Sequence, residues 1–490
     1  MVPGAARMSA LVISLVAAPL ALAALAGWLD ASALRVGAIA VGALVLVLAG
    51  LLGAAALASG QLNLWGQAVS LDGLGTLVLW TVAFVVFQSS WHSAGYFSGS
   101  HRLSLRPLRQ YYALWALFSA SMLAAPLFTN LALYWVLIEL TTLTSSLLVA
   151  FDRSPEALEG AWKYVIVVTV GVSLAFAATI LLYYAAVPVL GQVFAPDWPS
   201  LLAHARAFSP APVALALVLA VIGYGTKVGL VPMHTWLPDA HAVAPSPVSA
   251  MLSGCLLNTA FLGVARFWQI ARVTLGPSFP DGLLIFFGLL SLLIAALNLG
   301  SQSRLKRLLA YSSVEHMGII AFALGLSAPY LLGLQMLNHT LVKSSLFFAA
   351  GNAVQRFGQR LSELGGLLGR MPFTGFVLLL AGWAVTGAPP LNLFPSELGI
   401  AQAALGQGTW LGLLFIALLV LVFALFVGRW SSVIFGPGRA AGEASQDASW
   451  LALVPLGVGA ALILLFSVVT PGPIQQLLHL LARQLLAVPQ

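Results

Sequence analysis

The stretch GYGTKVGLVPMHTWLPDAHAVAPSP, residues 223–247, places one lysine and several prolines inside a long apolar segment. Lys227 follows an uncharged run, and Pro232 comes shortly after it. Proline ends or kinks a helix because it lacks the amide hydrogen and clashes with the preceding turn. A helix broken beside an ionisable side chain in an apolar chain is typical of ion and proton sites inside membranes. His234 and His241 flank the WLPDA segment, and we expect them to shape the break while Lys227 carries the proton.

Composition sets the class of protein. Of the 490 residues, 60% are hydrophobic and 7% are charged, whereas soluble domains carry about 25% charged residues. The chain is therefore predicted to be a membrane protein. Its formal charge of +7 comes mostly from arginines in short loops, where basic residues set the orientation in the membrane. We expect a lipid bilayer, and no nucleic acid, as its surroundings.

The chain carries no signature of catalysis or of cofactor binding. It has no phosphate-binding loop, dinucleotide fingerprint, HExxH motif or CxxC motif. Cys255 is the only cysteine, so an internal disulfide and an iron–sulfur cluster held within this chain are excluded. We expect no catalytic residue, no cofactor and no metal in this chain, so any redox chemistry would belong to another subunit.

Apolar runs of about 18 to 25 residues can each cross a bilayer as a helix, and about fourteen such runs predict an all-α polytopic membrane protein. The first run could instead be a cleaved signal peptide, because Arg7 precedes it and small residues lie near its end. A short amphipathic tail follows the last run. The expected spans cover approximately residues 9–28, 36–57, 74–91, two helices within 111–150, 161–186, 213–232, 248–268, 283–300, 308–326, 330–351, a span that starts near 373 and is interrupted by prolines, 411–433 and 450–469.

Basic residues are distributed unequally between the two sets of loops. This asymmetry predicts that the loops after odd-numbered spans are cytoplasmic and that both termini lie on the non-cytoplasmic side of the cell membrane. In or bordering the odd-numbered loops lie Arg35, Arg102, Arg106, Arg109, Arg153, Arg304, Lys306, Arg307, Arg356, Arg360, Arg370, Arg429 and Arg439, against Arg7, Arg206, Arg266, Arg272 and Arg483 on the opposite side.

The chain is expected to form a single transmembrane domain with an internal duplication. The twelfth span is interrupted at Pro389, Pro390 and Pro395, beside Glu397, as the seventh is interrupted beside Lys227. Paired interruptions at corresponding places are typical of two inverted repeats with their sites at the breaks. The expected boundaries are about 1–110 for the N-terminal helices, 111–270 for the first half, 282–435 for the second half, and 450–490 for the C-terminal helix and tail.

Ionisable side chains recur within or near the expected spans, although each buried charge costs several kcal/mol unless it is paired, hydrated or neutralised. Acids and bases spread over successive helices can form a hydrated proton relay across the middle of the protein. The residues are Glu139, Lys163, Lys227, His234, Glu315, His316, His339, Lys343 and Glu397, with polar Asn258 and Asn338 among them.

For four of these residues we favour the relay over a structural role. A carboxylate such as Glu139 holds the proton on a desolvated lysine, so moving it toward or away from Lys227 would switch protonation. Glu139 could instead form a structural ion pair, and Lys227 could snorkel to an interface, although the helix break argues against snorkelling. His339 and Lys343 are four residues apart and therefore share one helix face, whereas a lone histidine more often serves packing.

Three further residues are assigned accessory roles. Glu315 and His316 lie near enough to a cytoplasmic helix end that an interfacial ion pair is an equal alternative to the relay. Lys163 lies at the start of its helix, and we expect it to pair locally with Glu156 or Glu159.

Four segments of the chain resemble a known family. They are GTKVGLVPMHTWLPDAHAVAPSPVSAML, LKRLLAYSSVEHMGII, LNHTLVKSSLFF and GAPPLNLFPSE. They resemble the antiporter-like proton-pumping subunits of respiratory complex I, multisubunit sodium/proton antiporters and group 4 hydrogenases, over most of residues 111–435. The IELTTLTSSLLV segment and the YSSVEHMGI run look most like the F-type membrane subunit of hydrogenase-4.

The resemblance implies a fourteen-helix fold and a set of proton-translocating residues. Glu139 matches the family's fifth-helix glutamate, and Lys227 matches its seventh-helix lysine. His339 and Lys343 match the polar pair on the eleventh helix. Glu397 matches the twelfth-helix position, which is lysine or glutamate in different members.

One position departs from the pattern. Asn258 stands where complex I members usually carry an eighth-helix lysine, so we expect the central link to rely on water held by Asn258 and neighbouring histidines. The expected function is proton translocation within a redox complex, with other membrane subunits and a soluble redox module as partners. A sodium/proton antiporter subunit and the membrane subunit of an inorganic-carbon uptake complex are the alternatives.

Overall fold

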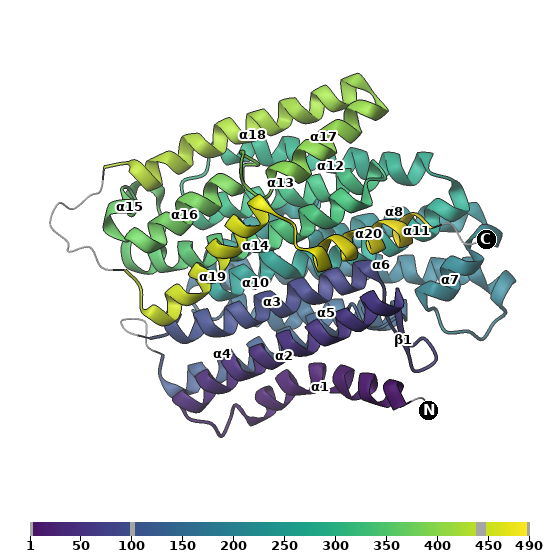
Figure 1. Cartoon of the computed structure of the whole chain (residues 1–490), viewed down its shortest axis with the longest axis horizontal. Helices are drawn as coiled ribbons and strands as arrows, with labels where there is room; N and C mark the ends of the chain where they lie inside the picture. The colour runs from purple at the N-terminus through teal and green to yellow at the C-terminus, as the bar shows by residue number, and fades with distance from the viewer. Residues whose placement is uncertain (1–2, 99–102, 438–446, 488–490) are drawn as a thin grey trace.

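The computed structural model describes residues 3–98, 103–437 and 447–487. Long helices lie side by side in one bundle (Figure 1). The first half of the chain forms α1 (Pro3–Leu25), α2 (Ala31–Ser59), β1 (Leu62–Leu64), β2 (Val69–Leu71), α3 (Gly73–Tyr96), α4 (Leu105–Ala124), α5 (Leu131–Val149), α6 (Pro155–Leu190), α7 (Trp198–His204), α8 (Pro210–Val228), α9 (Trp236–Val243) and α10 (Ser246–Met251). The second half forms α11 (Leu257–Leu275), α12 (Ser278–Leu299), α13 (Leu305–Gly325), α14 (Pro329–Phe357), α15 (Leu367–Arg370), α16 (Pro372–Ala384), α17 (Phe394–Gln407), α18 (Thr409–Phe435), α19 (Trp450–Val468) and α20 (Gly472–Leu486).

The number of membrane crossings agrees with the predicted fold class. Among the described residues, 11 helical segments are long and apolar enough to cross a membrane. Helices α4 and α14 have 20 and 29 residues, which at about 1.5 Å per residue is also enough to cross. The broken pair α16–α17 completes the expected set, and the tail predicted to be amphipathic is the helix α20.

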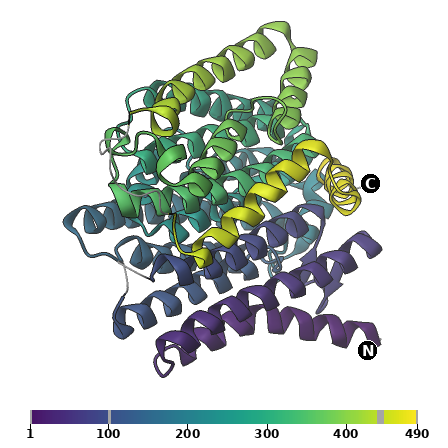
Figure 2. The ribbon, with the colours of Figure 1, turned by 60° about the vertical axis from the view of Figure 1, so that its left-hand side comes forward.

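The helices follow a clear order across the bundle. Helices α1 and α2 lie along one edge and α17 and α18 along the opposite edge, as Figure 1 and Figure 2 both show. Between them α3, α10 and α14 contact one another. The start of α1 and the end of α20 lie at the same end of the bundle. Arg102 and Arg439, two of the basic residues used to predict the orientation, lie outside the described residues.

The first predicted helix break is present beside Lys227. Helix α8 ends at Gly229, whose φ of 84° is in the left-handed region, and a Cβ there would lie 2.4 Å from Leu237 Cδ1. Glycine is therefore required at this turn. A 3₁₀ turn leads into α9, and Trp236 Nε1 donates a hydrogen bond of 2.7 Å to the Thr226 carbonyl. This bond ties the two parts of the broken helix together.

The second predicted break separates α16 from α17 beside Glu397. Asn338 on α14 donates a hydrogen bond of 2.6 Å to the Asn392 carbonyl. The Asn392 amide donates one of 3.0 Å back to Asn338 Oδ1. Both amides are buried, and the pair fixes the irregular backbone of residues 385–393 against α14. The hydrogen bonds of this pair satisfy polar groups of the kind that proline leaves unpaired in a membrane.

Three features were missed by the sequence prediction. A small antiparallel hairpin, β1–β2, occupies the polar connector before α3, and the short α7 lies between α6 and α8. Strands of three residues are too short to show a periodic pattern. Helix α6 begins earlier than expected because Ser154 caps it, accepting a hydrogen bond of 3.1 Å from the Ala157 amide.

A buried ion pair fastens the hairpin end of the bundle. Arg266 on α11 donates two hydrogen bonds, of 2.7 and 2.8 Å, to the carboxylate of Asp72, which precedes α3. The Arg266 guanidinium also lies 3.8 Å from the centre of the Trp198 ring. Burial alone would raise the pKa of Asp72, but the neighbouring Arg266 charge and its hydrogen bonds hold this pKa below its ordinary value.

Candidate functional site

Lys227 lies in the last turn of α8, directly before the break, and its side chain is fully buried. Its Nζ donates hydrogen bonds of 2.6 Å to the Tyr164 hydroxyl and 2.9 Å to Thr142 Oγ1. The Tyr164 hydroxyl also lies 2.7 Å from Ser145 Oγ. Lysine that snorkels would place its nitrogen at an interface, so this geometry is that of an interior polar site.

Glu139 lies on α5, near Lys227 but engaged with a different helix. Its Oε1 accepts a hydrogen bond of 2.9 Å from Thr169 on α6, and its Oε2 is buried without a hydrogen-bond partner in the described part of the chain. Within the described residues no ion pair joins Glu139 to Lys227. The two groups of the predicted pair are therefore bound to different hydroxyl side chains.

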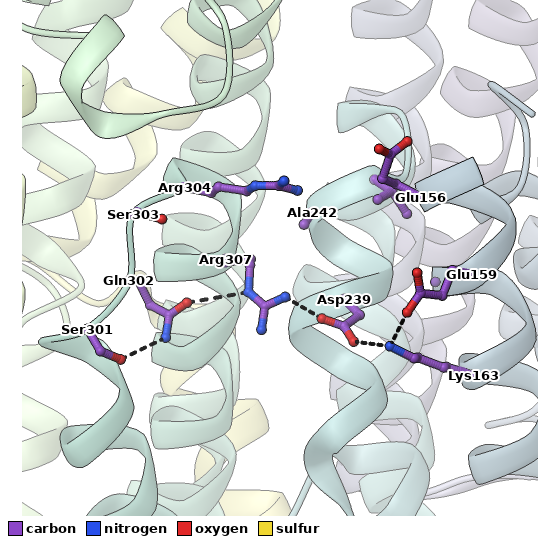
Figure 3. A pocket seen from close by; sticks show the side chains of 12 residues that line it. Glu156, Glu159, Lys163, Asp239, Ala242, Ser301, Gln302, Ser303, Arg304 and Arg307 are labelled. Atoms are coloured by element: carbon purple, nitrogen blue, oxygen red, sulfur yellow. Dashed lines mark hydrogen bonds and ion pairs between the residues drawn. The ribbon is translucent and has the colours of Figure 1, made fainter. Parts of the chain in front are cut away.

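A cavity of about 510 Å³ opens at the surface near the part of the site that contains Lys227 and Glu139 (Figure 3). Lys163 lies 2.5 Å from Glu159 and 3.5 Å from Asp239, and Arg307 on α13 pairs with the same Asp239. The predicted local pairing of Lys163 with Glu159 is confirmed, and Asp239 extends it into a charged chain across the cavity. Arg304 also points into the cavity in Figure 3.

Asn258 lies at the centre of the bundle, next to an irregular helix. A π-helical turn over Leu252–Leu256 precedes α11, and such turns are often found at functional sites. The Asn258 amide donates to Thr340 Oγ1 at 3.0 Å and to the Met336 carbonyl at 3.2 Å, both on α14. Its Oδ1 is buried and has no hydrogen-bond partner among residues 3–98, 103–437 and 447–487, so this atom is available to accept from water.

Two histidines near the centre have no partners for their ring nitrogens. His241 on α9 and His339 on α14 are each fully buried, and both nitrogens of each ring lack a hydrogen-bond partner among the described residues. The His241 ring stacks on Phe347, with 5.1 Å between ring centres. Because buried polar atoms are almost always hydrogen-bonded, orphaned atoms of this kind indicate water sites.

Lys343 lies on α14, fully buried like His339 four residues earlier. Its Nζ donates a hydrogen bond of 3.0 Å to the Leu309 carbonyl and another to Ser312 Oγ, both on α13. The His339 ring lies 5.5 Å, centre to centre, from the ring of His316, which is also on α13. Helices α13 and α14 thus carry the second half of the site between them.

His316 connects this pair to the second broken helix. Its Nε2 lies 2.9 Å from the Val385 carbonyl, and its Nδ1 lies 3.2 Å from the Gln335 amide nitrogen. A carbonyl can only accept and an amide nitrogen can only donate, so the contacts fit a neutral ring protonated at Nε2. The Gln335 amide also lies 3.3 Å from Glu397 Oε1, which is itself 3.7 Å from His316 Nδ1.

Glu397 lies in the first turn of α17 with 4% of its surface exposed. It forms part of the wall of a mostly apolar cavity of about 320 Å³ between the second break and α18. Gly387, with a φ of 63°, makes room for its carboxylate, since a Cβ there would lie 1.8 Å from Glu397 Oε2. Glycine at residue 387 therefore leaves the space that the Glu397 carboxylate occupies.

The remaining sequence candidates take different places. Glu315 is 2% exposed, and none of the described residues forms a hydrogen bond with its Oε2. It and His316 lie inside the bundle, so the interfacial ion pair considered for these two residues is not formed. His234 lies in the 3₁₀ turn of the first break. No group of three or more histidine, cysteine, aspartate or glutamate side chains suited to a metal occurs in the described part of the chain.

Several polar contacts at the site were not predicted from the sequence. Tyr164 and Gln335 each bridge two groups of the site, yet neither residue stands out in its helix. Thr142 and Ser145 lie in the hydroxyl-rich segment after Glu139, and that composition was the one available signal for them.

The chain is similar to several known membrane proteins. The family described as "NADH:quinone oxidoreductase/Mrp antiporter, TM" matches residues 129–423. The chain is 36% identical over 382 residues to a hydrogenase-4 component F homolog of Methylacidiphilum infernorum, an alignment that covers 76% of this chain and 80% of that protein. It is 29% identical over 442 residues to Na(+)/H(+) antiporter subunit A1 of Staphylococcus haemolyticus, covering 83% of this chain and 53% of that protein.

The fold also matches solved structures of large assemblies. A chain of the membrane-bound sulfane sulfur reductase, an archaeal respiratory membrane complex, superposes with a TM-score of 0.87. The match covers 98% of both chains at 24% sequence identity. The likeness confirms the polytopic all-α fold.

Proposed function

The chain belongs to the NADH:quinone oxidoreductase/Mrp antiporter transmembrane family, and from that premise we propose that it translocates protons as one membrane subunit of a redox-driven complex. A group 4 hydrogenase or a related complex I-like assembly fits best, because the hydrogenase-4 component F homolog aligns over most of both chains. Other membrane subunits and a soluble redox module would complete the assembly.

The observation that carries this proposal is a series of buried ionisable groups between the two broken helices. Lys227 lies at one break and Glu397 at the other, and Lys343 and His316 lie between them, all buried. Burying a charged group in a membrane protein costs free energy. Such groups are therefore found mainly where ions or protons move. Orphaned ring nitrogens and the free Asn258 Oδ1 supply places for connecting water.

Proton uptake is proposed at the charged cavity of Figure 3. Lys163 on the cavity wall is followed in α6 by Tyr164, whose hydroxyl contacts Lys227. Protons would then pass by Asn258, His339 and Lys343 and leave near Glu397. Glu139 would act as the gate, because its approach to Lys227 favours the protonated lysine and its withdrawal favours release.

Orientation and redox chemistry are part of the same proposal. The excess of basic residues supports cytoplasmic loops after the odd-numbered spans, which would place both termini on the non-cytoplasmic side. The matching interruptions support two inverted halves, residues 111–270 and 282–435. This chain would hold no cofactor, so the redox partner would supply the driving force through the membrane subunits.

A sodium/proton antiporter subunit is the second candidate. The relative from Staphylococcus haemolyticus carries that description and aligns with 83% of this chain. The same buried groups would serve exchange as well as pumping, and the dependence of transport on sodium separates the two.

The test uses the intact complex in inverted membrane vesicles, with Lys227→Ala compared against the unaltered complex. We expect electron transfer to continue while substrate-driven proton uptake is lost. Arg429→Gln, which removes a charge on exposed α18, is the matched control and should pump normally. Unchanged pumping by Lys227→Ala would refute the assignment, and transport that requires sodium without electron transfer would support the antiporter instead.

A further inference from the structure

A second large groove lies on the outer face of the bundle, away from the proton-transfer groups. It has a volume of about 960 Å³ and runs between α4, the end of α5 and the start of α6. Its wall is mainly apolar and is formed by Leu103, Ala113, Leu114, Leu147, Phe151 and Leu158. Leu147 and Leu158 are 57% and 51% exposed, so the groove faces the surroundings of the protein.

Two arginines stand at one end of this groove. Arg106 lies in the first turn of α4, and Arg153 lies in the loop between α5 and α6. Both side chains are exposed, and no hydrogen bond or ion pair within the described residues engages either guanidinium. Asp152 lines the same groove and is itself engaged in an interaction. The groove thus offers two guanidinium groups that have no acceptor within the described residues.

The depth of these residues matches the layers of a membrane. Helix α4 begins, α5 ends and α6 begins at this end of the bundle, so the arginines lie at the level where helices leave the hydrocarbon. Leu114 is nine positions along α4 from its start, about 13 Å deeper at 1.5 Å per residue. The polar end and the apolar wall are therefore stacked along the membrane normal.

We propose that this groove binds an anionic phospholipid. Arginine matches phosphate oxygens with two parallel hydrogen bonds, and basic pockets between membrane helices on the cytoplasmic side suit anionic headgroups. The acyl chains would follow the apolar wall past Leu114 and Leu147. A zwitterionic lipid carries its own cation, which would face the two guanidiniums and lose part of the attraction.

An apolar helix of a neighbouring protein suits the groove less well than a lipid does. Such a helix would fill the wall but would cover Arg106 and Arg153 without supplying acceptors, and burying an unpaired charge is strongly unfavourable. A lipid satisfies both parts of the groove with one molecule.

The test is photolabelling of the intact complex in nanodiscs with diazirine-bearing phosphatidylglycerol or phosphatidylcholine. We expect phosphatidylglycerol to label the peptides around Leu114 and Leu147 in preference to phosphatidylcholine. Each basic residue near a membrane surface contributes about fivefold in affinity for anionic lipid, so Arg106→Gln with Arg153→Gln should reduce the preference at least tenfold. Arg106→Lys with Arg153→Lys should retain part of it.

Controls separate this site from general effects of charge. Arg429→Gln removes a charge at α18 and should leave labelling at the groove unchanged, and the thermal stability of each variant confirms that it is folded. Equal labelling by both lipids, or a preference that survives the double glutamine variant, would overturn the proposal. Capture of a neighbouring protein by a photoreactive residue placed at Leu147 would likewise overturn it.

Discussion

The Nζ atom of Lys227 lies 2.6 Å from the hydroxyl oxygen of Tyr164 and 4.9 Å from the centre of its ring. Tyr164 therefore holds the lysine through its hydroxyl group. Glu139 lies apart and accepts a hydrogen bond from Thr169. In this structure Lys227 is bound to the hydroxyl groups of Tyr164 and Thr142. If its side chain moved toward Glu139, it would exchange these hydroxyl partners for the carboxylate.

Tyr164→Phe should disturb this arrangement while keeping the ring. A hydrogen bond to a charged group contributes about 1.5–3 kcal/mol, which corresponds to about tenfold to hundredfold in the balance between two positions of Lys227. We expect slower substrate-driven proton uptake in vesicles and a shifted dependence of uptake on pH. Tyr112→Phe is the control, because the Tyr112 hydroxyl is buried and forms no hydrogen bond with any described residue. Equal pumping by both variants would show that Tyr164 serves packing alone.

Gln335→Leu should separate His316 from Glu397. The Gln335 amide faces both groups, and its Oε1 accepts from Ser396, so an apolar side chain of similar size leaves buried polar atoms unpaired. Each such atom costs about 1–3 kcal/mol. We expect a lower Tm and proton transport reduced several-fold or more. Gln407→Leu, at the end of α17, is the control. Normal transport in Gln335→Leu would exclude this link from the pathway.

Gly387→Ala should displace Glu397. The new Cβ would overlap the carboxylate, and an alanine at positive φ adds about 1–2 kcal/mol of strain. We expect a lower Tm and loss of transport. In a Glu397→Ala background the overlap disappears, so the same change should lower the Tm less. Gly428→Ala, where nothing lies within 4 Å of the new Cβ, is the control. Additive effects of Gly387→Ala and Glu397→Ala would contradict the contact.

Asp72→Asn should change how stability depends on pH. Because the folded pKa of Asp72 is lowered, its stabilising contribution is present above the ordinary carboxyl pKa of about 4 and is lost as pH falls through the lower folded value. Breaking one partner of a buried pair costs about 3–5 kcal/mol. The Tm of the variant should therefore be well below that of the unaltered protein at pH 7.

The same experiment has an internal check. The Tm difference between Asp72→Asn and the unaltered protein should shrink as the pH falls below about 4. Asp30→Asn is the control, since Asp30 is an exposed cap of α2 and asparagine caps equally well. A difference that stays constant down to pH 3 would show that the Asp72 charge does not stabilise the fold.

The sequence by itself determined the membrane spans, the two breaks and the main ionisable residues. These features are local: a run of apolar residues has to form a helix in a bilayer, and proline interrupts the helix that contains it. Lys227 and Glu397 could also be identified beside the breaks from the sequence. Charged residues are rare in such a chain because each costs free energy in lipid, so each of them is conspicuous.

Only the tertiary structure decided which of these groups meet. Tyr164 reaches Lys227 from a helix 63 positions away in sequence, and Gln335 reaches Glu397 across 62 positions. Such contacts depend on how each helix is rotated about its axis and how its ridges pack against its neighbours. That information is distributed over whole helix faces, so no local pattern showed that the Tyr164 hydroxyl binds Lys227 or that the Gln335 amide contacts both His316 and Glu397.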